Sequence, residues 1–267
     1  MNPSQALATE YSEKAKAYAR HWAPVIGPMA LPLFQALPLG TAGTVLDVGT
    51  GTGSLLPDLR KSAPNAMILG VDYAAGMLQI ARQTGGPLLA VMDAQQLGIR
   101  STTIDVAVLV FVLFHMPDPL RCLREVRRVL RSEGAIGMVT WGQDPGLPGV
   151  SIWTEELNRA GARPDPRDPS VMRQGQMDTA EKLRRLLDSV DFAAVKGWST
   201  SVRLQWTLEN LLALQMGCGM PARRLSSLSS EARARCVSRV KARLAELAGA
   251  ELTYEAEVLF STASRPA

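Results

Sequence analysis

The 267-residue sequence has few of the residues on which several protein classes depend. Its three cysteines, Cys122, Cys218 and Cys236, are an odd number without paired spacing, which argues against a disulfide framework or a zinc site and fits a reducing cytoplasm. Its longest apolar run, residues 106–114, is far too short to span a bilayer and is typical of a buried strand. The first residues lack the basic start and apolar core of a signal peptide. We therefore expect a cytoplasmic protein without a membrane span.

An excess of one charge is also absent. The formal net charge is +4 and the positive residues are scattered, so electrostatics do not demand a nucleic-acid partner, although a pI near 9.1 leaves one open. Arginines recur over residues 223–243. They form either a basic face for an acidic substrate or RNA or, as is more common, a solvated helix surface. The sequence leaves a homodimer open.

Apolar runs and amphipathic helical patterns alternate from residue 44 to residue 141. The pattern predicts strands at 44–48, 67–72, 88–92, 105–112 and 135–141. It predicts helices between them at 53–61, 75–83 and 120–130. Continuously apolar strands that alternate with helices indicate a parallel sheet covered on both faces, which is a doubly wound α/β fold.

The flanking segments follow other patterns. Residues 7–26 form an amphipathic helical stretch, and a short helix follows near 32–37. Beyond Trp141 the sequence predicts helices at 152–159, 179–190, 208–216 and 230–247, and strands at 194–206 and 254–261. We interpret the chain, 1–267, as one domain with an N-terminal helical lid at 1–40 and a core at 41–142.

Residues 45–59, VLDVGTGTGSLLPDL, join a strand to a helix through three alternating glycines, Gly49, Gly51 and Gly53. Backbone N–H groups at such a turn hold anions, and dinucleotide enzymes use a related turn. Here the spacing is G-x-G-x-G, and Asp47 lies two residues before the first glycine. A buried acid would repel a pyrophosphate and would suit an ammonium group, such as the one on S-adenosylmethionine.

Two further acids end the next two strands. Asp72 follows the second strand at a position suited to hydrogen bonding of both ribose hydroxyls. Asp93 follows the third strand, where it suits the exocyclic amine of adenine, with the backbone N–H of Ala94 beside it. Ligands bind at the carboxyl edge of open α/β sheets, so these acids indicate one nucleotide site.

Five segments in order resemble motifs I to V of the class I S-adenosylmethionine-dependent methyltransferases, particularly the small-molecule, UbiE-like branch. They are LDVGTGTG, GVDYAAGML, VMDAQQL, IDVAVLVFVLFHMPD and LREVRRVLRSEGAIGMVTW. The resemblance implies a Rossmann-like, seven-stranded sheet, parallel with an antiparallel last strand. It also implies that segments 143–177 and 206–249 are insertions that cover the substrate.

The resemblance implies S-adenosyl-L-methionine as the cofactor and a set of residues that bind it. They are Tyr11, Tyr18, Asp47, Gly49, Thr50, Gly51, Gly53, Asp72, Tyr73, Met77, Asp93, Ala94 and Phe111. Tyr73 and Met77 also fit simple helix packing, and the Tyr11, Tyr18 and Trp22 stripe also fits a packing face.

The substrate side is less defined by the sequence. His115 follows the fourth strand and is the candidate catalytic base, although it also fits a structural role. Methyl transfer mainly requires alignment and exclusion of water, so an obvious catalytic triad is not expected. The candidate substrate contacts favour a small, hydrophobic or aromatic acceptor and are His21, Trp22, Trp141, Trp153 and Met216.

Other functions remain open. One is an RNA-modifying methyltransferase, and another is a methyltransferase fold that binds the cofactor but catalyses a non-methylating step. Methylation of base amines is disfavoured, because residues 111–114, Phe-Val-Leu-Phe, replace the Asn/Asp-Pro-Pro-Tyr/Phe sequence usual in those enzymes. A dehydrogenase is disfavoured by Asp47 and by the glycine spacing.

Overall fold

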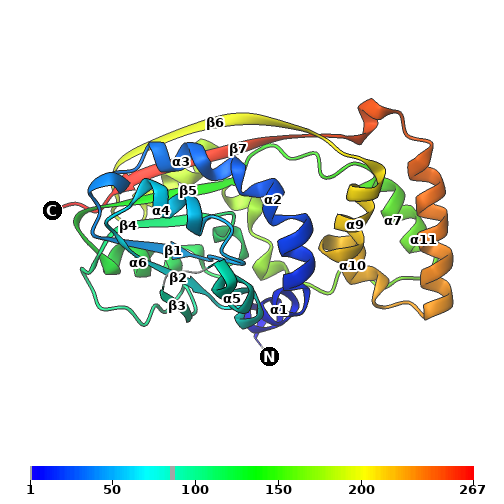
Figure 1. Cartoon of the computed structure of the whole chain (residues 1–267), viewed down its shortest axis with the longest axis horizontal. Coiled ribbons are helices and arrows are strands. Elements are labelled where there is room, and N and C mark those ends of the chain that lie inside the picture. The colour runs from blue at the N-terminus through cyan, green and yellow to red at the C-terminus, as the bar shows by residue number, and fades with distance from the viewer. Residues whose placement is uncertain (1, 85–87) are drawn as a thin grey trace.

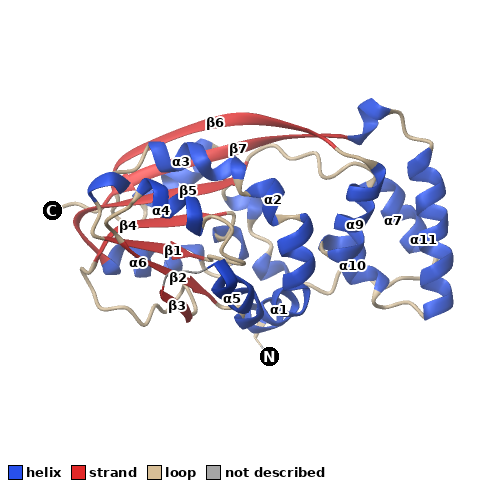
Figure 2. Cartoon of the chain, in the orientation of Figure 1, coloured by secondary structure: helices blue, strands red, loops and turns tan. Residues whose placement is uncertain are grey.

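The computed structural model describes residues 2–84 and 88–267, in which seven strands form one sheet covered by helices (Figures 1 and 2). The strand order is β3-β2-β1-β4-β5-β7-β6. The strands are β1 Thr44–Val48, β2 Met67–Asp72, β3 Leu88–Val91, β4 Ile104–Val110, β5 Leu130–Trp141, β6 Ala193–Gln205 and β7 Thr253–Ser264. Strands β1 to β5 pair in parallel, and β7 runs antiparallel to both β5 and β6. The predicted fold class is confirmed.

The register places the functional ends of the strands at one edge. Val48 of β1 lies opposite Val71 of β2 and Leu109 of β4, and Asp72 lies opposite Val91 of β3. The residues that follow these strands therefore gather at the carboxyl edge of the sheet, where open α/β sheets bind ligands.

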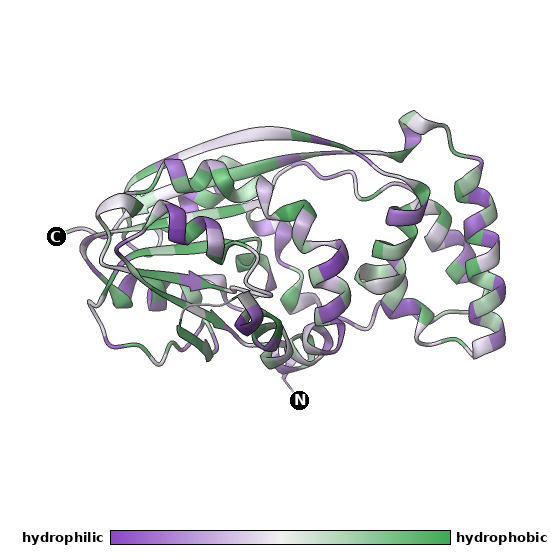
Figure 3. Cartoon of the chain, in the orientation of Figure 1, coloured by the Kyte–Doolittle hydropathy of each residue, from purple (hydrophilic) through white to green (hydrophobic). Residues whose placement is uncertain are grey.

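Two hydrophobic layers cover the sheet because its central strands are apolar on both faces. One layer includes side chains of α3 Leu31–Gln35 and α4 Leu56–Ser62. The other includes α6 Pro119–Val129 and α8 Ala180–Asp188. Figure 3 shows the mostly hydrophobic central strands between these helices.

A group of helices beyond the sheet forms the helical unit, shown at the right of Figure 1. It consists of α7 Val150–Arg159, α9 Leu208–Gly217, α10 Gly219–Leu225 and α11 Ser230–Ala245. Its own hydrophobic core contains Trp153, Leu212 and Val240. The last three helices are inserted between β6 and β7, which pair as far as Gln205 and Thr253.

Ion pairs join the helices of this unit. Glu156 of α7 is fully buried, and its carboxylate accepts from Arg239 at 2.6 Å and from Arg243 at 3.0 Å. Arg235 pairs with Glu231 on the surface of α11. Several arginines of residues 223–243 therefore bind carboxylates of the chain itself, which favours the structural interpretation of the arginine-rich stretch.

The N-terminal helix α1, Pro3–His21, lies between the sheet and the helical unit (Figure 1). It packs closely on α5, Ala75–Ala81, where the hydroxyl of Ser12 accepts from the backbone N–H of Gly76 at 3.1 Å. A Cβ at Gly76 would lie 2.6 Å from the carbonyl oxygen of Ser12, so only glycine permits this approach. A short helix α2, Ala23–Ile26, follows α1.

The elements differ from the sequence predictions mainly at their ends. Helix α4 begins at Leu56, three residues after the predicted start, because Gly53 has a left-handed backbone with φ of +75°. Strand β5 begins at Leu130, and helix α10 was not predicted. Within the described residues, the structure has no helix with the length and apolarity needed to cross a membrane.

Candidate functional site

The turn after β1 is held by glycine geometry and by β2. Gly49 and Gly51 have φ of +74° and +56°, and a Cβ at Gly49 would overlap Val112. The N–H groups of Gly49 and Thr50 donate to the carbonyl of Val71 at 2.8 and 3.0 Å. The loop is thus fixed in a left-handed conformation that side-chain-bearing residues rarely adopt.

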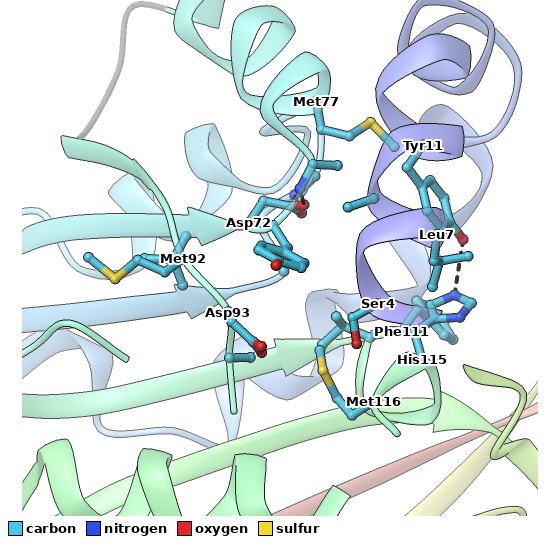
Figure 4. A pocket seen from close by; sticks show the side chains of 18 of the residues that line it. Ser4, Leu7, Tyr11, Asp72, Met77, Met92, Asp93, Phe111, His115 and Met116 are labelled. Carbon is cyan, nitrogen blue, oxygen red and sulfur yellow. Dashed lines mark hydrogen bonds between the residues drawn. The ribbon is translucent and has the colours of Figure 1, made fainter. Parts of the chain in front are cut away.

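A cavity with about 800 Å³ of empty space, the first cavity, lies at the carboxyl edge of the sheet beneath α1 (Figure 4). It extends from the glycine loop past Asp72 and Met77 to Asp93 and His115. Ten of the thirteen predicted cofactor residues line it, namely Tyr11, Tyr18, Gly49, Gly51, Asp72, Tyr73, Met77, Asp93, Ala94 and Phe111.

A smaller cavity adjoins the first one behind the glycine loop. Asp47 and Thr50 line it, together with Gly49, Gly51 and Tyr18, which also line the first cavity. Gly53 lies on neither wall, and a Cβ there would be 2.9 Å from that of Ala81 in α5. Gly53 therefore allows close packing between loop and helix, and its contact with the cofactor stays a prediction.

Asp47 is the most enclosed acid of the site, with 1% of its surface exposed. Burial raises the pKa of its carboxyl to about 6, although the Thr50 hydroxyl donates to it at 2.7 Å. Because burial penalises its charge, this carboxylate gains from a cationic ligand group.

Asp72 organises the loop as well as the cavity. Its two carboxyl oxygens accept from the N–H groups of Gly51 at 2.9 Å and Ala74 at 2.8 Å. Burial raises the pKa of Asp72 despite these backbone donors. Asp93 similarly accepts from the N–H of Gln95 at 2.8 Å, so each acid is oriented by the backbone that follows it.

The backbone is strained directly after β4, at Phe111, which lines the first cavity. Phe111 has φ of +51°, an uncommon conformation for a bulky residue, and its N–H donates to Val139 at 2.9 Å. Its ring stacks on Trp141 at a centroid distance of 4.4 Å. Backbone strain of this kind concentrates at functional sites.

His115 is hydrogen-bonded at both ring nitrogens, and Figure 4 shows the bond to Tyr11. Its Nδ1 is 3.4 Å from the carbonyl oxygen of Val171, which only accepts, so Nδ1 carries the proton. Its Nε2 then accepts from the Tyr11 hydroxyl at 3.0 Å. Burial lowers the pKa of His115 to about 4 and raises the pKa of Tyr11 to about 12. Both groups are therefore neutral at pH 7.

A second cavity, with about 1010 Å³ of empty space, lies between α1, the end of β5 and the helical unit. Tyr11 and Tyr18 line both the first and the second cavity. The predicted substrate residues Trp22 and Trp141 are on its wall, with ring centroids 6.2 Å apart.

The other three predicted substrate residues lie elsewhere. Trp153 is fully buried in the core of the helical unit, where its indole N–H donates to Gln215 at 2.7 Å. Met216 packs against the same core. His21 lies beside Gly217 of α9, where an added Cβ would be 3.7 Å from its ring. None of these three residues is among those that line the second cavity.

Most residues of the second cavity were not among the predicted substrate contacts, although Arg223 belongs to the arginine-rich stretch for which an acidic substrate was considered. They are Glu10, Lys14, Asp144, Leu147, Arg167, Leu214, Cys218, Gly219, Arg223 and Tyr254. Amphipathic spacing along α1 gave a weak signal for Glu10 and Lys14, which are one turn apart. The others come from segments that only the fold brings together.

Comparison with known proteins agrees with this geometry. Residues 46–138 match the family model described as "Methyltransferase domain". A demethylmenaquinone methyltransferase of Corynebacterium kroppenstedtii is 35% identical over 117 residues, which are 43% of this chain and 49% of that protein. The chain spans about half the length of the first curated relatives it matches.

Two solved structures show the same fold. A putative methyltransferase of Bacillus halodurans has a TM-score of 0.58 and 17% identity, covering 90% of this chain and all of that one. A Haemonchus contortus phosphoethanolamine N-methyltransferase, solved with phosphomonomethylethanolamine and S-adenosylhomocysteine, has a TM-score of 0.56 and 17% identity. That alignment covers 96% of this chain and 58% of the nematode protein.

The sheet order and the acids at its carboxyl edge agree with the match of residues 46–138 to the methyltransferase domain model. The part of the chain that is similar to this domain lies in the sheet core, and α1 and the helical unit flank it.

Proposed function

We propose that the protein transfers the methyl group of S-adenosylmethionine to a small aromatic or hydrophobic molecule held in the second cavity. The observation that carries this proposal is the meeting of the two cavities at Tyr11 and Tyr18. Methyl transfer requires the acceptor atom, the methyl group and the sulfonium in line, with water excluded. Two cavities that share Tyr11 and Tyr18 would bring a bound cofactor and a bound acceptor next to each other.

The first cavity suits the cofactor along its whole length. Asp72 would accept from the ribose hydroxyls and Asp93 from the adenine amine, with Met77 and Tyr73 beside the ring. Asp47 in the adjoining cavity would pair with the ammonium group of the methionine end. Phe111, which stacks on Trp141 of the second cavity, would then lie beside the sulfonium. The cofactor supplies an activated methyl group.

The second cavity suits an aromatic acceptor. Its wall includes Trp22, Trp141 and Tyr254, and the rings of Trp141 and Tyr254 are 6.2 Å apart in an edge-on arrangement. Leu147 and Leu214 complete the apolar part of the wall. Cavities with mainly apolar and aromatic walls bind small molecules through burial and ring contacts.

The hydrogen-bonded pair of Tyr11 and His115 could accept the proton that the acceptor loses on methylation. Tyr11 faces the second cavity, so its oxygen can take a proton from the acceptor while its own proton passes to Nε2 of His115. The low pKa of His115 suits a proton that leaves after methylation has made the acceptor strongly acidic. In this scheme His115 remains the candidate base and Tyr11 connects it to the acceptor.

Calorimetric titration with S-adenosylmethionine, S-adenosylhomocysteine and NAD tests the cofactor assignment. We expect the two adenosyl compounds to bind and NAD not to bind. Acceptor screening by mass spectrometry then follows, with a gain of one methyl group as the readout. Binding of NAD alone, or of none of the three, would contradict the proposed function.

A further inference from the structure

Five charged side chains form a continuous chain of ion pairs at one end of the second cavity, called here the ionic chain. Glu10 accepts from Lys14 at 2.9 Å and from Arg223 at 3.1 Å. Asp165 accepts from Arg223 at 2.9 Å and from Arg167 at 3.0 Å. The order Lys14, Glu10, Arg223, Asp165, Arg167 alternates in sign and has a cation at each end.

The ionic chain is firmly held. The Arg223 side chain at its centre is only 9% exposed. Burial opposes the ionisation of Asp165, yet hydrogen bonds from Arg223 and Arg167 lower its pKa to about 2. Counted by formal charge, three cations against two carboxylates leave one positive charge in excess in the ionic chain.

The ionic chain separates two spaces. Four of its members, Glu10, Lys14, Arg167 and Arg223, line both the second cavity and an outer groove beside α1. The aromatic side chains of the second cavity, Trp22, Trp141 and Tyr254, come from other elements. The cavity thus combines an aromatic wall with a cationic end.

We infer that the acceptor carries an acidic group, a carboxylate or a phosphate, which binds between Lys14 and Arg167 while its ring lies against Trp22 and Trp141. This inference rests on the proposed function, because it assigns the chemistry of the acceptor in the second cavity. Guanidinium groups hold carboxylates and phosphates through paired hydrogen bonds, and an ammonium group adds a point charge.

The charge balance favours an acid over other acceptors. A cationic acceptor would meet the excess positive charge of the ionic chain, and a neutral one would leave that charge uncompensated beside an apolar wall. Among the described residues, two carboxylates line the second cavity, Glu10 of the ionic chain and Asp144. Asp144 accepts from the N–H of Gly146 at 2.8 Å, and burial together with the charge of Asp144 raises the pKa of Tyr254. Asp144 therefore interacts with its own loop and with Tyr254 rather than with the ionic chain.

Calorimetry on the protein saturated with S-adenosylhomocysteine tests the inference. The probes are aromatic carboxylates with one and two rings, among them 4-hydroxybenzoate, the primary amides of the same acids, and phenyl phosphate. We expect at least one acid to bind about tenfold or more tightly than its amide, the scale of a charge-assisted hydrogen bond. Comparison of the carboxylates with phenyl phosphate shows which acidic group the site prefers.

Variants at the two ends of the ionic chain test whether these cations cause the preference for acids, and they leave the buried Arg223 in place. Lys14→Met and Arg167→Gln should each reduce the preference for acid over amide. Arg235→Gln, which breaks an exposed ion pair on α11, should leave the preference unchanged. Circular dichroism and S-adenosylhomocysteine binding verify that each variant is folded.

Equal binding of acids and amides, tighter binding of the amides, or no binding of any probe by the saturated protein would overturn this inference alone. A preference for acids that survives both Lys14→Met and Arg167→Gln would also overturn it. Failure to bind S-adenosylhomocysteine would instead contradict the proposed function.

Discussion

At the scale of single residues, Asp47 couples the site to pH. Burial raises its pKa to about 6, and an ammonium group beside it would stabilise the ionised form. Affinity for S-adenosylmethionine should therefore rise with pH up to about 6 and level off above it. We expect binding about tenfold weaker at pH 5 than at pH 7, because about a tenth of such a carboxyl is ionised one unit below its pKa.

Calorimetry between pH 5 and pH 7 checks this, a range in which the amino group of the ligand stays protonated. Asp47→Asn should bind more weakly at pH 7 and lose the pH dependence. A wild-type affinity that is flat over this range would show that Asp47 does not contact the ammonium group.

The hydrogen bond between Tyr11 and His115 should also contribute measurably to the free energy of unfolding. A neutral hydrogen bond contributes about 1 kcal/mol, and leaving a buried partner unpaired costs a similar amount. A double-mutant cycle of Tyr11→Phe and His115→Phe, followed by urea unfolding, should give a coupling free energy of about 1 kcal/mol. Additive effects of the two substitutions would mean that the 3.0 Å contact adds nothing to stability.

At the scale of elements, the contact of α1 with α5 holds together two helices that line the first cavity. A Cβ at Gly76 would lie 2.6 Å from the Ser12 carbonyl, so Gly76→Ala must separate the two helices. We expect a loss of about 1–3 kcal/mol of stability, typical of overpacking, and weaker binding of S-adenosylhomocysteine. Gly40→Ala is the matched control, since a Cβ there meets nothing within 4 Å. Equal effects of both substitutions in thermal unfolding would refute this.

The elements were predictable where one local signal dominated. Strands β1 and β2 were predicted at their observed bounds, because continuous apolar runs end at turn-forming residues. Helix α10 was missed because Gly219 and Pro221 are typical of a loop, whereas in the structure Pro221 occupies the first turn of the helix, where it is tolerated. The helix start after Gly53 was misplaced because φ values cannot be read from spacing alone.

At the scale of the whole molecule, the gathering of the three acids at one sheet edge was predictable, whereas most of the second cavity was not. Asp47 and Asp72 lie at the carboxyl ends of β1 and β2, and Asp93 follows β3, so local patterns already bring the three acids to one edge. The ionic chain instead joins Glu10 to Arg223, 213 positions apart, through α1 and an inserted helix. Its packing depends on how the helical unit sits on α1, which no local pattern specifies.

This long-range contact should couple the cofactor to the helical unit. Helix α1 provides Leu7, Ala8, Tyr11 and Tyr18 to the first cavity, and Glu10 of the same helix accepts from Arg223 of α10. Opening of α1 would therefore break contacts with the cofactor and with α10 together. A ligand that stabilises the closed state of α1 reduces every opening that requires α1 to move.

Hydrogen exchange measured by mass spectrometry tests this coupling. Saturation with S-adenosylhomocysteine at 100 times its dissociation constant should slow exchange in α1 by up to about 100-fold, and should also slow exchange in α10. In Arg223→Gln the slowing should remain in α1 and disappear from α10, because the ion pairs to Glu10 and Asp165 are lost. Arg235→Gln, with its surface ion pair on α11, should behave as wild type. Exchange in α10 that ignores the ligand in the wild-type protein would show that the helical unit moves independently of α1.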